Sequence, residues 1–451
     1  MDTVIKRNAT RRLIIAILSF VVGFLFIETV CYGFEQIDSN GVKPNFLWVV
    51  GFAALMVIWN EVLIIRQKDE GGFVCSKARM VEIRFWEAVL MALSILCGIS
   101  MNIALTFFFL IACTIYMVMC TTGHLFREET SVFLPADIIN GVFRIPFAAF
   151  NSRIAALKNF LRVNAEYKSE QVNASEAKKS RTGIAVGIAL IVVAVPVLAI
   201  VLSSLSSADA NFENIMNSIS ESIGNFFEYI FDGKLAEIII KMILAYPCGL
   251  YIHSLFEGSI NRNASFERRK EKDWSVGIKK LQVVPFGIIL GIFAVFTLVY
   301  ILFFISQATN LFSAFAGVLP QEYTASRYAR NGFFELCRVM VINILMLGVL
   351  SVFSRKDLYE SAIMKITGVS FMVESFIFSL ISASKLLLYI NRFGFTVLRY
   401  QSLWATAVLG AASLLIAVNI ITHKKTAKIW LWFTALSYIA VNIFVAAVYF
   451  I

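Results

Sequence analysis

Charged side chains enter the apolar part of the chain in one stretch, residues 320–400. Charge at membrane depth is costly, so such side chains usually face a partner or a water-filled cavity. Arginine matches phosphate and carboxylate groups through two parallel hydrogen bonds. The side chains of this stretch that could together bind an anionic ligand are Arg327, Arg330, Glu335, Arg338, Glu374, Lys385, Tyr389, Arg392 and Arg399.

The spacing of these side chains predicts which of them meet. On one helix, a rotation of about 100° per residue places Arg327, Glu335 and Arg338 on the same face. On the next helix, Glu374 and Lys385 share a face but lie about 16 Å apart along the axis, too far to pair. We therefore expect Glu335 to partner Lys385, and Arg327 or Arg338 to partner Glu374.

Three interpretations of this polar stretch remain open. It is a structural charge network that fixes the packing of two adjacent helices, an outward-facing pocket for an anionic or lipid-like ligand, or a proton or ion relay through Glu335 and Glu374. These two are also the carboxylates of the stretch that an enzyme acting on a lipid-linked substrate would need. The enzyme is the least supported of these functions.

Known catalytic and cofactor-binding motifs are missing from the sequence. It contains no HExxH, GxSxG, nucleotide-binding loop or dinucleotide fingerprint. The three histidines are far apart, and the seven cysteines form no CxxC pair. We expect no catalytic residue, no metal ligand and no cofactor, and we exclude a self-contained ATP-driven pump.

The composition is that of an integral membrane protein. Of the 451 residues, 59% are hydrophobic and only 16% are charged, whereas soluble proteins carry about a quarter charged residues. The mean hydropathy is +0.77. We expect one all-α polytopic membrane domain over residues 1–451.

Runs of about 20 apolar residues predict the membrane spans. They indicate about eleven transmembrane helices, with ten to twelve as the range. The pair 84–98 and 102–121 is the least clearly separated. The predicted spans are 13–33, 46–65, 84–98, 102–121, 182–204, 236–256, 283–305, 332–353, 362–388, 401–421 and 429–450.

The distribution of charge among the loops predicts the orientation. With the N-terminus inside, the inner segments hold 31 of the 40 basic residues but only 16 of the 30 acidic ones, as cytoplasmic loops do. This indicates a multi-pass protein of the plasma membrane with a cytoplasmic N-terminus and an outside C-terminus. The basic clusters lack interleaved aromatic side chains, so they indicate anionic inner-leaflet lipids of the bilayer as partners, and not nucleic acid.

Two stretches between spans have apolar side chains at helical spacing. The cytoplasmic loop 122–181 contains the first, residues 133–166, which predict an interfacial amphipathic helix or a docking helix for a membrane protein partner. The second, residues 205–235, also carries acidic side chains. It predicts an amphipathic helix at the outer leaflet.

Two motifs within residues 320–400 carry a resemblance to a known family. The first is Tyr328-Ala329-Arg330 with Gly332-Phe333-Phe334-Glu335-Leu336, and the second is Phe393-Gly394-Phe395-Thr396 with Arg399. They resemble bacterial polytopic membrane proteins known only as a domain of unknown function, of the forty-one-seventy-three type, close to the forty-one-fifty-three type. That family's second motif usually has leucine where Phe395 stands here. The resemblance implies a helical membrane fold and brings no activity or site residue.

Function therefore stays open between two classes. One is transport or handling of an anionic or lipid-like ligand at the outward-facing pocket lined by arginine and lysine. The other is a non-enzymatic membrane sensor, or an accessory subunit of a membrane complex, that acts through its cytoplasmic loops.

Overall fold

The computed structural model describes residues 2–35, 46–69, 77–100, 102–123, 125, 130, 134–168, 233–260, 280–306, 325–355, 358–359 and 361–450. Its regular elements are helices, and the described residues contain no strand. One isolated parallel bridge joins Val284 to Ser354. The expected all-helical fold is therefore confirmed.

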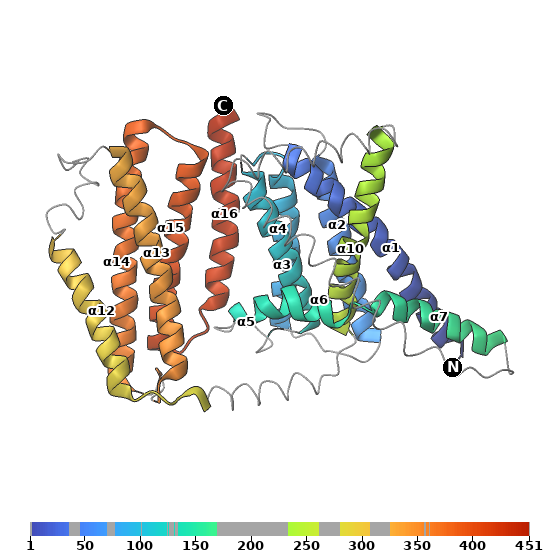
Figure 1. The fold of residues 1–451 in the computed structure, drawn as a ribbon, viewed down its shortest axis with the longest axis horizontal. Coiled ribbons are helices and arrows are strands. Elements are labelled where there is room, and N and C mark those ends of the chain that lie inside the picture. Colours follow the sequence, from blue (N-terminus) through green and yellow to red (C-terminus); the bar gives the residue numbers. More distant parts are fainter. Residues whose placement is uncertain are drawn as a thin grey trace, which may run out of the picture. The chain divides into compact units, whose positions relative to one another are not determined.

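The helices follow one another along the chain (Figure 1). Residues 140–144 (η3) are π-helical, and the other elements are α-helices. Their bounds are α1 Asp2–Glu35, α2 Leu47–Asp69, α3 Lys77–Leu96, α4 Ile103–Thr122, α5 Leu134–Ile139, η3 Asn140–Arg144, α6 Ile145–Ala148, α7 Ser152–Lys168, α10 Gly233–Ile260, α12 Phe286–Ser306, α13 Ala325–Phe353, α14 Ala362–Phe393, α15 Val397–Thr422 and α16 Ala427–Phe450.

Nine of the described helices are long and apolar enough to cross a membrane: α1, α2, α4, α10, and α12 to α16. The predicted span 84–98 falls on α3, which is not among them, because Glu82, Arg84 and Glu87 add charge to its first half. The predicted span 182–204 lies outside the described residues. The chain is a membrane protein with several spans, and the count of eleven stays a prediction.

The chain divides into two compact units, the first formed by Met1–Tyr32 and Ile145–Gly258. In this unit α1 and α10 cross at Gly23 and Gly249, where a Cβ atom on either glycine would overlap the backbone of the other helix. Lys241 of α10 also pairs with Glu28 of α1 at 3.0 Å. The crossing is thus fixed by backbone contact and by one ion pair.

The second unit comprises Gly33–Arg144 and Ser259–Ile451. Helix α14 packs against α12, α13 and α15, and α3 packs against α2, α4 and α16. Aromatic rings fill the space between α12 and α14, where Tyr300 stacks on Phe371 and meets the edge of Phe378. Main-chain hydrogen bonds join Val284, before α12, to the end of α13: Val284 N donates to Phe353 O at 3.1 Å and Arg355 N donates to Val284 O at 3.2 Å.

The predicted amphipathic segment 133–166 is helical, since α5, η3, α6 and α7 cover residues 134–148 and 152–168. On α7 the side chains of Ile154, Leu157 and Leu161 are exposed, which fits an interfacial helix. Its position against a membrane stays a prediction. The predicted outer helix, residues 205–235, lies outside the described residues except for the start of α10 at Gly233.

Candidate functional site

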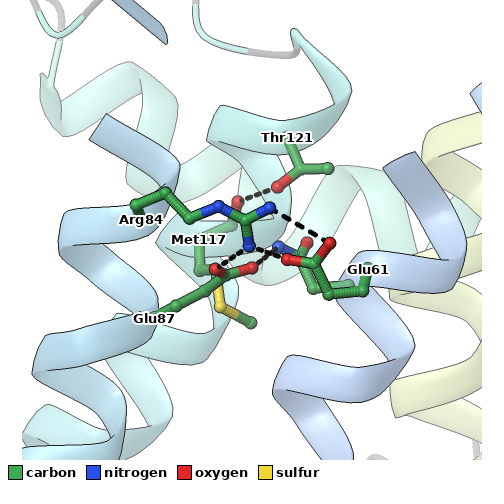
Figure 2. A network of polar contacts seen from close by, with 6 residues as sticks. Glu61, Arg84, Glu87, Met117 and Thr121 are labelled. Atoms are coloured by element: carbon green, nitrogen blue, oxygen red, sulfur yellow. Dashed lines mark hydrogen bonds and ion pairs between the residues drawn. The ribbon is translucent and has the colours of Figure 1, made fainter. Parts of the chain in front are cut away.

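Four polar side chains of α2 and α3 form one connected group, which we call the α2–α3 charge cluster (Figure 2). Arg84 makes ion pairs with both Glu61 and Glu87. Its Nη1 lies 2.6 Å from Glu87 Oε2, and its Nη2 donates to Glu61 Oε2 at 3.2 Å. Asn60 Nδ2 donates to Glu87 Oε1 at 2.8 Å. Both oxygens of Glu87 are therefore hydrogen-bonded.

Helix geometry brings these groups together. Arg84 and Glu87 are three residues apart on α3, so they share a face. That face meets α2 at Asn60 and Glu61. On α4, the hydroxyl group of Thr121 donates to Met117 O of its own helix at 3.0 Å.

Burial differs among the members of the cluster. Asn60 is 0% exposed and Glu87 is 6% exposed, whereas the side chain of Arg84 is 52% exposed. The cluster has two carboxylates and one guanidinium. The more buried carboxylate, Glu87, thus shares its cation with another acid.

A second buried carboxylate on α3 has a cation of its own. Glu82 is 2% exposed, and its Oε2 lies 3.0 Å from Lys428 Nζ of α16. Thr130 Oγ1 donates to Glu82 Oε1 at 2.6 Å and also bonds to the Tyr116 hydroxyl group. The Glu82–Lys428 ion pair connects α3 to α16, and the charge of Glu82 is balanced by that of Lys428.

Sequence reasoning missed both groups. The predicted span 84–98 separates Glu82, in the preceding loop, from Arg84 and Glu87 at the start of the span, so the sequence prediction does not group the three residues. The sequence feature that could have revealed them is the presence of three charged residues within six positions of α3. This helix packs against the apolar helices α2 and α4. Charges that lie among apolar helices usually mark function or pairing.

The polar stretch of residues 320–400 is divided by the structure. Arg327 and Arg330 lie in the first turns of α13, and their side chains are not described. Glu335, Arg338 and Arg392 are exposed. Lys385 is half-buried on α14, and its expected partnership with Glu335 stays a prediction.

Glu374 has a different partner from the expected arginine. It is 8% exposed, and Thr297 of α12 donates to its Oε2 at 3.3 Å. Phe333 of α13 packs beside Leu386 and Ile390 of α14, so Arg338 lies level with a part of α14 that is about 13 Å from Glu374 along the axis. The antiparallel register of the two helices thus keeps Arg338 away from Glu374.

Arg399 is engaged by the end of α14. Its Nη1 donates to Phe393 O at 2.8 Å and to Gly394 O at 2.5 Å, and its guanidinium lies 4.1 Å from the centre of the Tyr389 ring. Gly394 has a φ of 75°, a conformation that side chains with a Cβ rarely adopt. Arg399 and Tyr389 therefore stabilise the turn between α14 and α15.

Metal chemistry has no evident centre in the part of the chain that the structure describes. No group of three or more His, Cys, Asp or Glu side chains there is arranged to hold a metal ion.

Comparison with known proteins gives one match. A family model described as "Domain of unknown function (DUF4153)" matches residues 87–449. This range begins at Glu87 and contains all of residues 320–400, where the resemblance was seen. Of the two related types considered from the sequence, the match supports the forty-one-fifty-three type. No curated protein and no solved structure is significantly similar to the chain.

Proposed function

Because the chain belongs to the DUF4153 family, whose description assigns no activity, we propose a function from the geometry alone. The protein transports or handles an anionic or lipid-like ligand, and it binds that ligand at the cationic ends of α13 and α14. In this proposal the site faces outward from the plasma membrane, with the N-terminus in the cytoplasm and the C-terminus outside.

The observation that carries the proposal is the exposure of Arg338. It lies five residues inside the span Phe333–Phe353, which is about 7.5 Å along the helix axis. Among the described residues it has no hydrogen-bond or ion-pair partner. A guanidinium at this depth extends toward the headgroup level and needs an anion or water there.

The surroundings of Arg338 suit an amphipathic ligand. Lys385 adds a second cation from α14. Arg392 lies about two turns further along the same face of that helix. Large exposed aromatic side chains flank these cations and would contact an acyl chain; they are Phe334, Phe393 and Phe395. A phosphate beside apolar surface is the chemistry of a phospholipid headgroup.

Ligand binding by purified variants tests this proposal. We expect Arg338→Ala to weaken binding of an anionic phospholipid, measured by native mass spectrometry in detergent, about tenfold or more, as loss of a charged hydrogen bond does. Arg355→Ala is the matched control, because it removes the same charge from the segment just after the other end of α13. Equal binding by the parent and Arg338→Ala proteins would refute the site.

A second candidate is the sensor or accessory subunit. It is favoured by α7, which exposes Ile154, Leu157 and Leu161 beside the basic Lys158 and Arg162. Under this function, crosslinking in native membranes recovers one reproducible partner. Substituting the three apolar residues by serine abolishes that crosslink and leaves binding of lipid by the Arg338 site unchanged.

A further inference from the structure

Glu374 is a carboxyl group that lies well inside the helix bundle without a cation. Its side chain is 8% exposed, and it stands about 18 Å along α14 from Ala362. Its hydrogen-bond partner Thr297 lies near the midpoint of α12, a helix whose 21 residues carry no charge. Within the part of the chain that the structure describes, Glu374 forms no ion pair and no other hydrogen bond.

The charged residues nearest to Glu374 are all far along the helix axes. The helices that pack against α14 are α12, α13 and α15. On α14 itself, Lys365 and Lys385 are about 14 and 16 Å away along the axis. Arg338 is the charged residue that lies deepest in the span of α13, about 13 Å from Glu374 along the axis. The charged residue of α15 is Arg399, which is bonded to the end of α14.

An ionised carboxylate is expensive at this place, because neither water nor a cation compensates its charge. The bond from Thr297 Oγ1 to Glu374 Oε2 is 3.3 Å long, whereas a hydroxyl group that donates to a charged carboxylate usually lies about 2.5–2.7 Å from it. A bound proton removes the charge and requires no further ligand. A metal ion requires several ligands, and no three His, Cys, Asp or Glu side chains are grouped to hold one among the described residues.

The hydroxyl group of Thr297 suits both the ionised and the neutral form of Glu374. A hydroxyl group carries one donor and two acceptor lone pairs, and its hydrogen rotates. It donates to the carboxylate when Glu374 is ionised. When Glu374 carries a proton, the hydroxyl oxygen can accept it while the hydroxyl hydrogen turns to the carbonyl group one turn earlier on α12, as threonine does within helices.

A neutral polar pair lies one helical turn from this contact. Tyr300, three residues after Thr297 on α12, stacks on Phe371, three residues before Glu374 on α14. The Tyr300 hydroxyl group donates to Asn343 Oδ1 of α13 at 2.6 Å, and Asn343 is 0% exposed. The proton of Tyr300 is thus already used in this bond, and the pair supplies no charge to Glu374.

We propose that Glu374 is a proton-binding site inside the bundle, with the Thr297 hydroxyl group as its hydrogen-bond partner in both protonation states. The site differs from a relay through Glu335, which is exposed on α13. It does not depend on the anion site proposed at the ends of α13 and α14, so loss of either site leaves the other in place.

Carbodiimide labelling of the whole protein in detergent tests the proposal. Dicyclohexylcarbodiimide reacts with protonated carboxyl groups in apolar surroundings: the carboxyl oxygen bonds to the central carbon of the reagent, the acid proton moves to its nitrogen, and no group leaves. The internal control is Glu82, which is 2% exposed but is paired with Lys428. We expect mass spectrometry to find about tenfold more adduct at Glu374 than at Glu82 at about pH 6. Labelling of Glu374 that does not exceed that of Glu82 would overturn the proposal.

Two substitutions at Thr297 test whether the missing cation is the cause. Thr297→Lys places an ammonium group beside Glu374, so we expect labelling of Glu374 to fall about tenfold or more, as a neighbouring opposite charge favours the ionised form. Thr297→Val has nearly the same size and adds no charge, so labelling should persist. Parent-like labelling of a folded lysine variant, or loss of labelling in the valine variant, would contradict the proposal. If the lysine variant does not fold, the valine variant and the comparison with Glu82 decide.

Discussion

The guanidinium of Arg399 lies 4.1 Å from the centre of the Tyr389 ring while the same group donates to two main-chain carbonyl groups at the end of α14. These carbonyls belong to Phe393 and Gly394, and they are the unsatisfied acceptors that every helix C-terminus leaves. A cation there also interacts favourably with the helix dipole. An arginine that looks like a ligand-binding residue in the sequence therefore acts on the protein's own backbone.

Removal of Arg399 should loosen the turn between α14 and α15. We expect Arg399→Ala to lower stability by about 1–3 kcal/mol, since it removes charged hydrogen bonds and a cation–π contact. The midpoint of thermal unfolding in detergent measures this loss. Arg399→Lys keeps the charge but not the planar guanidinium, so its stability should fall between those of the parent and the alanine variant. A lysine variant as unstable as the alanine variant would contradict the role of charge.

Arg84 should stabilise the α2–α3 charge cluster. Its replacement by alanine leaves Glu61 and Glu87 together without a cation, and we expect a loss of about 2 kcal/mol, reduced from the cost in a closed core because half of the Arg84 side chain is exposed. A double-mutant cycle with Glu61→Gln measures the coupling. Additive effects of the two substitutions would show that the ion pair does not contribute.

The crossing of α1 and α10 depends on the absence of a side chain at Gly249. We expect Gly249→Ala to destabilise the protein by about 1–3 kcal/mol, because the added methyl group overlaps the backbone of α1 near Ser19 and Gly23. Gly287→Ala on α12 is the matched control, since no atom lies within 4 Å of its Cβ position. Equal unfolding midpoints of the two variants would argue against a tight crossing.

Arg153 of α7 is a cation with buried, unbonded donors. Its Nε and Nη2 have no hydrogen-bond partner among the described residues, Nη1 is 3.5 Å from Tyr246 O, and burial lowers the pKa of its guanidinium. Replacement by methionine keeps the apolar bulk and removes the unbonded groups, so we expect stability to rise by about 1 kcal/mol.

Unfolding midpoints of the Arg153→Met and Arg162→Met proteins check this prediction. Arg162 is exposed on the same helix, so its replacement should leave the stability unchanged. The pH dependence has a definite sign. A lowered pKa means that the unfolded chain holds the proton more tightly, so Arg153 costs stability at every pH below its lowered pKa. The gain from methionine should therefore be constant from pH 6 to 9, and a gain that varies within this range would contradict the assignment.

The sequence predicts the helices better than the charge partners. Apolar runs long enough to span a bilayer locate nine described helices, because in lipid the backbone must satisfy its hydrogen bonds within each segment. The pairing of Glu335 with Lys385 is expected from helical spacing and stays a prediction. Periodicity, however, describes one helix at a time.

Partners on other helices require the register between helices, which periodicity does not contain. Thr297 as the partner of Glu374, and Asn60 as the partner of Glu87, each join segments separated by many residues. The backbone role of Arg399 depends on a turn whose geometry is set by Gly394. These contacts come only from the folded arrangement.

The two main-chain hydrogen bonds between Val284 and the end of α13 have an evolutionary consequence. They involve backbone atoms alone, so these two bonds do not depend on the identity of the side chains. A residue gained or lost between Val284 and Phe286 would shift α12 relative to the bonded Val284 and so move Thr297 relative to Glu374. Related chains should therefore reject insertions and deletions in this junction.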